Sequence, residues 1–98
     1  MHLNDDLEQQ SHMGRREKMF AQVLRGTSDG NISFEAMRHL LKSLGFSERI
    51  RGSHHIFAKT GIIEILNLQS DGNSCKPYQV KQVRGVILNN KMGGKTDD

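Results

Sequence analysis

Near the middle of the chain, five consecutive residues combine a guanidinium, a hydroxyl and two imidazoles: Arg51-Gly52-Ser53-His54-His55. Such groups could cleave a phosphodiester without a metal. A base removes a proton from the ribose 2′-hydroxyl or from water, and cations stabilise the charge that gathers on phosphorus. Histidine suits the proton transfer because it titrates near neutral pH, and Gly52 permits a backbone conformation or a close approach that a side chain would block. Adjacent histidines are also common as exposed strand residues, so the spacing alone does not establish this chemistry.

The alternation of side chains does not reveal which histidine is available. Successive side chains of an extended strand point to opposite faces. His54 therefore shares one face with Ile56, whereas His55 shares the other with Phe57. Either face could be the buried one on these residues.

Other chemistries lack a suitable set of residues. His54-His55 has no CxxC partner, and neither Cys75 nor His39 is spaced to complete a zinc site. No base or orienting residue can be placed beside Cys75 to make it a nucleophile. Asp71-Gly72-Asn73 is typical of a turn rather than of a phosphate-binding glycine loop. We therefore expect no metal and no small-molecule cofactor.

Three segments that must position these groups have the apolar spacing of helices. Residues 15–24 are followed by Gly26, in the place of a helix C′ residue. Residues 34–44 carry one apolar stripe, with Ser33 as N-cap and Gly45 at the end. The last helix begins at Pro77, a usual first-turn residue. Its expected buried face holds Val80, Val83, Ile87 and Leu88, and its outward face holds Gln79, Lys81, Gln82 and Arg84.

Three short segments between these helices predict strands. Residues 46–51, 53–59 and 62–68 are rich in β-branched and aromatic residues. Thr60-Gly61 has the length of a tight hairpin, and residues 69–76 predict a polar loop. The order α-α-β-β-β-α predicts an α+β two-layer sandwich, with the helices on one face of an antiparallel meander and the other face open to solvent or a partner.

Length and composition restrict the class of protein. A chain of 98 residues with 35% hydrophobic residues predicts one small domain. We expect residues 1–12 to be an expression leader, residues 13–92 to form the domain and residues 93–98 to be a mobile tail. No run approaches the roughly 18 apolar residues of a membrane helix, and no basic, then apolar, signal sequence opens the chain. The single Cys75 then predicts a cytoplasmic protein with an incidental thiol.

Charge is distributed unevenly along the chain. The formal net charge is +3, but five of the acidic residues lie within residues 1–12 and 97–98. The remaining body holds fourteen basic and six acidic residues, which gives it a charge of about +8. A basic body of this size favours a polyanionic partner, nucleic acid first and an acidic protein second. A basic surface that only keeps the protein in solution is the alternative.

Two stretches together resemble a known family. The first is Leu40-Leu41-Lys42-Ser43-Leu44-Gly45-Phe46 followed by Arg51-Gly52-Ser53-His54-His55-Ile56-Phe57. The second is Asn67-Leu68-Gln69 followed by Lys76-Pro77-Tyr78-Gln79-Val80-Lys81-Gln82-Val83-Arg84. Their order and spacing are similar to those of the HicA (YcfA-like) bacterial toxins, over residues 32–88.

The resemblance implies a fold, an activity and a partner. HicA proteins have an α-β-β-β-α fold like that of the double-stranded-RNA-binding domain. They act as metal-independent endoribonucleases on mRNA and are held inactive by a HicB antitoxin. The family's catalytic histidine, in the motif G-[ST]-H, corresponds to His54, whereas His55 has no fixed role. We expect the nucleic-acid contacts to come from Arg51, Gly52, Ser53, Lys59, Lys76, Lys81 and Arg84.

Several alternatives stay open at this point. The chain could be a non-catalytic RNA-binding module with the same fold, or a protein-interaction module. The partner of His54 in acid–base catalysis could be water, the substrate or a lysine. The helix at residues 15–24, which the shortest family members lack, could pack on the core, contact the antitoxin or extend the RNA surface.

Overall fold

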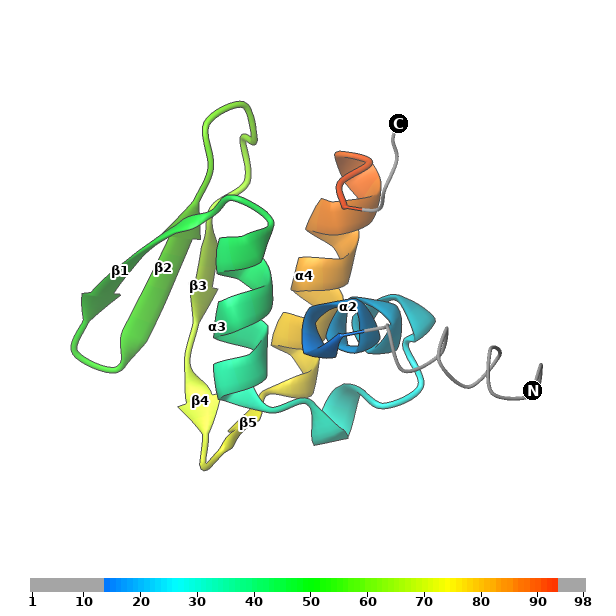
Figure 1. Cartoon of the computed structure of the whole chain (residues 1–98). Coiled ribbons are helices and arrows are strands. Elements are labelled where there is room, and N and C mark those ends of the chain that lie inside the picture. The colour runs from blue at the N-terminus through cyan, green and yellow to red at the C-terminus, as the bar shows by residue number, and fades with distance from the viewer. Residues whose placement is uncertain (1–13, 94–98) are drawn as a thin grey trace.

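A computed structural model describes residues 14–93 as an α+β fold of three α-helices and a small antiparallel sheet. The helices are α2 (Arg15–Arg25), α3 (Phe34–Ser43) and α4 (Pro77–Asn89), with a short 3-10 turn, η1 (Asp29–Asn31), between α2 and α3. They lie to one side of the sheet (Figure 1). The predictions for residues 1–12 and 94–98 lie outside the described residues.

The sheet has three strands in the order β1 (Ser47–Arg51), β2 (His54–Ala58) and β3 (Leu66–Leu68). Both pairings are antiparallel, as the predicted meander requires. Among residues 14–93, β1 pairs with β2 alone, and no other strand lies on its second edge. One face of the sheet packs on the helices, and no described element covers the other, as the predicted open face requires (Figure 1).

The local signals for the helices are confirmed. The Ser33 hydroxyl accepts a hydrogen bond from the Ala36 amide at 3.1 Å, so Ser33 caps α3. Gly26 ends α2 with φ 75°, a left-handed conformation that glycine adopts without strain. Pro77 occupies the first turn of α4.

The core forms where the three helices meet the covered face of the sheet. It includes the whole apolar stripe of α3 and the central Phe57 of β2, which is fully buried. From α2 it takes Met19 and Val23, so the N-terminal helix packs on the core rather than standing apart. Removing that helix would expose apolar surface of α3 and α4, against which it packs.

The third strand is shorter than predicted, and the tight hairpin lies elsewhere. Only Leu66–Leu68 pairs with β2, and Ile63 and Ile65 before it are 93% and 65% exposed. Residues 59–65 form a longer loop, held to the end of α4 by a hydrogen bond from the Asn90 amide to Glu64 at 3.1 Å. The turn at Thr60-Gly61 does form, because the Ile62 amide donates to the Lys59 carbonyl at 3.0 Å. It leads into this loop and not directly into β3, so the prediction of a tight hairpin there is wrong.

The segment predicted as a polar loop contains a small hairpin. Strands β4 (Ser70–Asp71) and β5 (Ser74–Cys75) pair across a turn at Gly72, which has φ 63°. The hairpin is fixed to the segment before α3, because the Cys75 amide donates to the Ile32 carbonyl at 2.8 Å. Cys75 is buried, and burial raises the pKa of its thiol to about 12, as expected for an unreactive thiol.

Helix α4 is oriented differently from its predicted faces at three positions. Leu88 is 60% exposed rather than buried, and Val86 takes a place in the core. Gln79 is buried, because its side-chain oxygen accepts the Gln69 backbone amide at 3.2 Å. Arg84 is held inside an ion pair with Asp29 at 3.0 Å. Within residues 14–93, no helix has both the length and the apolar character needed to span a membrane.

Candidate active site

The tight turn of the sheet lies at Gly52-Ser53, between β1 and β2. Gly52 has φ 60°, whereas Ser53 does not have a positive φ. Glycine at the first of two turn residues is typical of the type II′ hairpin, whose twist matches that of the strands. The turn sets the register in which Arg51 lies directly opposite His54.

The two histidines point to opposite faces of the sheet. His55 packs edge-on against the Phe34 ring of α3, with ring centroids 4.9 Å apart, so it belongs to the covered face. His54, one residue before it, therefore projects from the open face, where it is exposed. The structure thus settles the question of faces that the sequence leaves open.

The open face around His54 is basic. Residues directly opposite one another in an antiparallel pair share a face, and the residues of β1 that share the face of His54 are Arg51, Arg49 and Ser47. Arg51 is paired with His54, and Arg49 is paired with Ile56, two residues further along β2. Both arginines are exposed. An anionic chain lying on this face would meet two guanidinium groups beside an imidazole.

Two amide side chains from the end of β3 contact the Gly-Ser-His segment. The Nδ1 atom of His54 lies 3.0 Å from Oδ1 of Asn67. The Nε2 group of Gln69 donates to the Ser53 hydroxyl oxygen at 2.8 Å. Asn67 lies between the buried Leu66 and Leu68 and so projects to the open face, and Gln69 follows two residues later. The hairpin turn and the end of β3 therefore form one polar cluster.

A different arrangement holds His55. Its Nδ1 atom lies 2.7 Å from Oε2 of Glu48, whose side chain is 4% exposed. Arg38 donates to the same carboxylate at 2.6 and 2.9 Å, and Lys42 pairs with it at 3.0 Å. These cations, Arg38 above all, hold the pKa of Glu48 far below its usual range. The network ties α3 to β1 and β2 on the covered side.

The predicted nucleic-acid contacts are not all brought together. Arg51, Gly52 and Ser53 lie beside His54 at the hairpin turn. Lys76 precedes α4 at the same end of the sheet, because Gln79, one turn later, holds Gln69. It is half-buried.

The other three predicted contacts belong to the helix layer. The Lys59 ammonium lies against Gly45 at the end of α3, and Lys81 is exposed on α4. Arg84 donates to both oxygens of Asp29 and to the Val23 carbonyl, so its predicted outward position is wrong. Its guanidinium joins α4 to α2 and η1 instead of facing a ligand.

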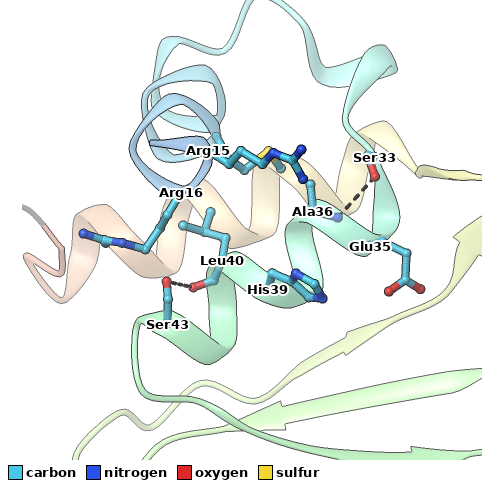
Figure 2. Close-up of a pocket in the computed structure, with 9 residues that line it drawn as sticks. Arg15, Arg16, Ser33, Glu35, Ala36, His39, Leu40 and Ser43 are labelled. Atoms are coloured by element: carbon cyan, nitrogen blue, oxygen red, sulfur yellow. Dashed lines mark hydrogen bonds between the residues drawn. The ribbon is translucent and has the colours of Figure 1, made fainter. Parts of the chain in front are cut away.

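A groove of about 480 Å³ lies between α2 and α3. Arg15 and Arg16 reach over it from α2, and His39 lines it from α3 above an apolar floor (Figure 2). The groove lies on the side of α3 opposite to Arg38. Arg38 itself contacts the sheet, because it donates a hydrogen bond to Glu48 of β1. The groove is therefore separate from the open face that carries His54.

Among residues 14–93, no group of three or more His, Cys, Asp and Glu side chains is placed to hold a metal ion. Comparison of the chain with protein-family models, with curated proteins and with solved structures finds no significant match. The resemblance to HicA toxins therefore depends on the motifs of the chain itself.

Sequence reasoning missed three residues of the cluster. Arg49 received no role, although its place two residues before Arg51 on a strand is enough to put both on one face. Asn67 and Gln69 entered only as part of the family-like motif. Their contacts with His54 and Ser53 depend on the register of β2 and β3, which no short-range signal in the sequence specifies.

Proposed function

We propose that the chain is an endoribonuclease of the HicA toxin type, which cleaves mRNA in the cytoplasm with His54 as a general acid or base and without a metal. One observation carries the proposal. His54 is exposed on the open face of the sheet, held at one ring nitrogen by Asn67, with Arg51 directly opposite. A positioned imidazole beside a cation is what proton transfer at a phosphodiester needs.

The surroundings of His54 suit a phosphate chain. Arg49 and Arg51 offer guanidinium groups, which bind phosphate oxygens through two parallel hydrogen bonds. The open face contains no Phe, Tyr or Trp in the described strands, so a platform for stacking bases on the sheet is not part of the proposal. RNA would be held through its backbone, and such contacts position a strand without reading its sequence.

We also propose the fold and the partner that the family resemblance implies. The element order from α3 to α4 agrees with an arrangement like the double-stranded-RNA-binding domain, to which the short β4–β5 hairpin is an addition. A HicB-type antitoxin would silence the protein by covering the open face, since one contact surface then blocks both the imidazole and the arginines. An acidic antitoxin would associate quickly with this basic face.

The direct test is cleavage of a fluorescently labelled RNA in excess EDTA. We expect the wild type to cleave it, and His54→Ala to lose about 10²- to 10⁴-fold in rate, the usual contribution of a general acid or base. His39→Ala is the matched control, because this histidine lies in the separate α2–α3 groove and its loss should leave the rate unchanged. A 2′-deoxy substitution at the cleaved position shows whether the 2′-hydroxyl or water attacks.

The result also separates the enzyme from a binding module. Arg49 and Arg51 would hold RNA whether or not His54 performs chemistry. If the wild type binds RNA but never cleaves it, the chain is a non-catalytic RNA-binding module. If His54→Ala cleaves at the wild-type rate, the catalytic assignment of His54 is wrong.

Coverage by the antitoxin has its own measurement. Diethyl pyrocarbonate modifies accessible histidines, and mass spectrometry locates the modified residues. We expect His54 to be labelled in the free protein and protected in the complex with the product of the adjacent gene. Equal labelling of His54 in both states would mean that the antitoxin binds another surface, such as the α2–α3 groove that contains His39.

A further inference from the structure

We propose that Asn67 and Gln69 are positioning residues, which fix the direction in which His54 and Ser53 present their reactive atoms to the phosphate. The inference deepens the ribonuclease function proposed above and rests on it. It concerns two side chains of one strand end that contact two consecutive residues of the hairpin turn. Each amide occupies one hydrogen-bonding position of its partner and leaves the other position facing outward.

The first contact determines the tautomer of His54. An amide oxygen only accepts hydrogen bonds, so the 3.0 Å contact with Asn67 Oδ1 requires that His54 Nδ1 carry the proton. In a neutral imidazole the other nitrogen, Nε2, then holds a lone pair. His54 thus presents an acceptor to the open face, which is the form that removes a proton from a hydroxyl.

The second contact gives Ser53 the complementary role. Its hydroxyl oxygen accepts from the Gln69 amide at 2.8 Å, so the hydroxyl proton stays free to donate. A non-bridging phosphate oxygen gains negative charge during the reaction and accepts such a proton strongly. The turn would therefore place one acceptor and one donor side by side, which together match a hydroxyl nucleophile and a phosphoryl oxygen.

The amides are themselves held in place. Asn67 lies between the buried Leu66 and Leu68, which fix the strand on the core. The Gln69 backbone amide donates to the side chain of Gln79, which is 3% exposed, so the first turn of α4 supports the end of β3. The backbone from which both amides project is therefore fixed, and a rotation of either side chain would leave His54 or Ser53 without its hydrogen bond.

An amide also suits this site electrostatically. A carboxylate in the place of Asn67 would fix the same tautomer but add a negative charge next to bound phosphate. The charged side chains that strands β1, β2 and β3 place on this face beside His54 are Arg51, opposite His54, and Arg49, two residues away on β1. A neutral acceptor therefore orients the imidazole without opposing the polyanion that the arginines attract.

The first experiment measures the tautomer without any reaction. In ¹⁵N-labelled protein, long-range proton–nitrogen spectra distinguish Nδ1–H from Nε2–H imidazole. We expect His54 in the Nδ1–H form, and Asn67→Ala to move it toward Nε2–H. Gln69→Ala should leave that tautomer unchanged, and His55, bonded to Glu48, is an internal reference in every variant. A wild-type His54 in the Nε2–H form, or an unchanged tautomer in Asn67→Ala, would overturn the inference.

The second experiment follows cleavage of RNA. We expect Asn67→Ala to lower kcat at least about tenfold with little change in KM, because orientation rather than binding is lost. Asn67→Asp should keep the tautomer and move the acidic limb of the kcat profile to higher pH, since a carboxylate favours the protonated imidazole. If the acidic limb does not move in Asn67→Asp and Asn67→Ala keeps the wild-type kcat, Asn67 has no positioning role.

The two experiments separate this inference from the function beneath it. If the tautomer responds to Asn67 as expected but no variant and no wild type cleaves RNA, the positioning contact is supported and the ribonuclease proposal fails. If cleavage depends on His54 but is indifferent to Asn67, the ribonuclease proposal is supported and the positioning inference fails.

Discussion

His54 and His55 are neighbours on β2 with the same side chain, yet they belong to different parts of the molecule. His55 is enclosed by Phe34 of α3 and by the buried carboxylate of Glu48. His54 is exposed, and its side chain is held by Asn67 of β3. The first has its hydrogen bond and its packing fixed by the fold, whereas the second keeps a ring nitrogen available.

The difference shows how a strand divides its tasks. Successive residues face opposite sides, so a two-residue motif can contribute to the core and to a reactive surface at once. On the covered side, charge is neutralised internally, because Arg38, Lys42 and His55 all converge on Glu48. On the open side, Arg49 and Arg51 have no acidic neighbour within their own strand face. Substitutions on the two sides should therefore affect different measurements.

The largest effect on stability is expected at Glu48. Glu48→Ala leaves Arg38 partly buried without its main partner, which costs about 3–5 kcal/mol in the free energy of unfolding. Urea unfolding, followed by circular dichroism, measures the loss. Glu64→Ala is the control, since this carboxylate accepts a neutral hydrogen bond from the Asn90 side chain and should change stability by no more than about 1.5 kcal/mol. Equal losses in both would mean that the network does not stabilise the covered face.

Substitution of His55 should affect mainly stability, whereas substitution of His54 should affect mainly cleavage. His55→Ala removes a hydrogen bond to a buried carboxylate, so we expect it to lower the free energy of unfolding by about 1.5–3 kcal/mol. His54→Ala should change it by no more than about 0.5 kcal/mol, as is usual for an exposed side chain, while abolishing cleavage. Folded His55→Ala protein should keep much of its cleavage rate. A variant at His54 that unfolds the protein would remove the distinction between the faces.

The pH dependence of stability should come from the covered face. The folded pKa of Glu48 is depressed, chiefly by the hydrogen bonds from Arg38, so its contribution is complete above the ordinary carboxylate pKa of roughly 4.3. As pH falls below that value, the unfolded chain binds the proton first and stability is lost. We expect thermal unfolding of the wild type to shift downward in this acid range, and Glu48→Gln to flatten that shift.

The smallest effect is expected from the open-face arginines and concerns binding alone. Each phosphate contact contributes about 0.7 to the slope of log affinity against log salt for single-stranded RNA. Arg49→Gln/Arg51→Gln should thus flatten that slope by roughly one to two units, measured by fluorescence anisotropy. Lys81→Gln is the matched control from the helix layer and should leave the slope close to wild type. The reverse result would place the RNA on α4.

The sequence was sufficient for the elements whose signals are local. The cap at Ser33, the left-handed Gly26 and Pro77 each act within one turn of helix, and all three positions were predicted correctly. The apolar stripe of α3 also identified its buried face. The predicted bounds of the third strand were wrong. Ile63 and Ile65 have strong β propensity, yet the chain lies outside the sheet there, where Glu64 accepts a hydrogen bond from Asn90. Propensity does not include such a tertiary contact.

The candidate site was predictable only in part. The Gly-Ser-His segment identified the location, and the family resemblance selected His54, but which of the two histidines is exposed required the position of Phe34 of α3. Arg84 illustrates the opposite case. A cation on a helix surface predicts a contact with phosphate, whereas its true partner, Asp29, lies far back in the sequence. Periodicity describes which side of a helix a residue occupies and says nothing about the segment that covers that side.

The ion pair of Arg84 with Asp29 also affects when the chain can complete its folding during synthesis. Asp29 and the end of α2 are synthesised early. The Arg84 guanidinium, which pairs with Asp29 and donates to the Val23 carbonyl of α2, comes later, from α4. The same helix supplies Val80, Val83 and Ile87 to the core. A nascent chain that stops before α4 therefore has no completed interior against which to dock the hairpin. The emerging polypeptide would therefore reach its native form only after α4, residues 77–89, has been synthesised.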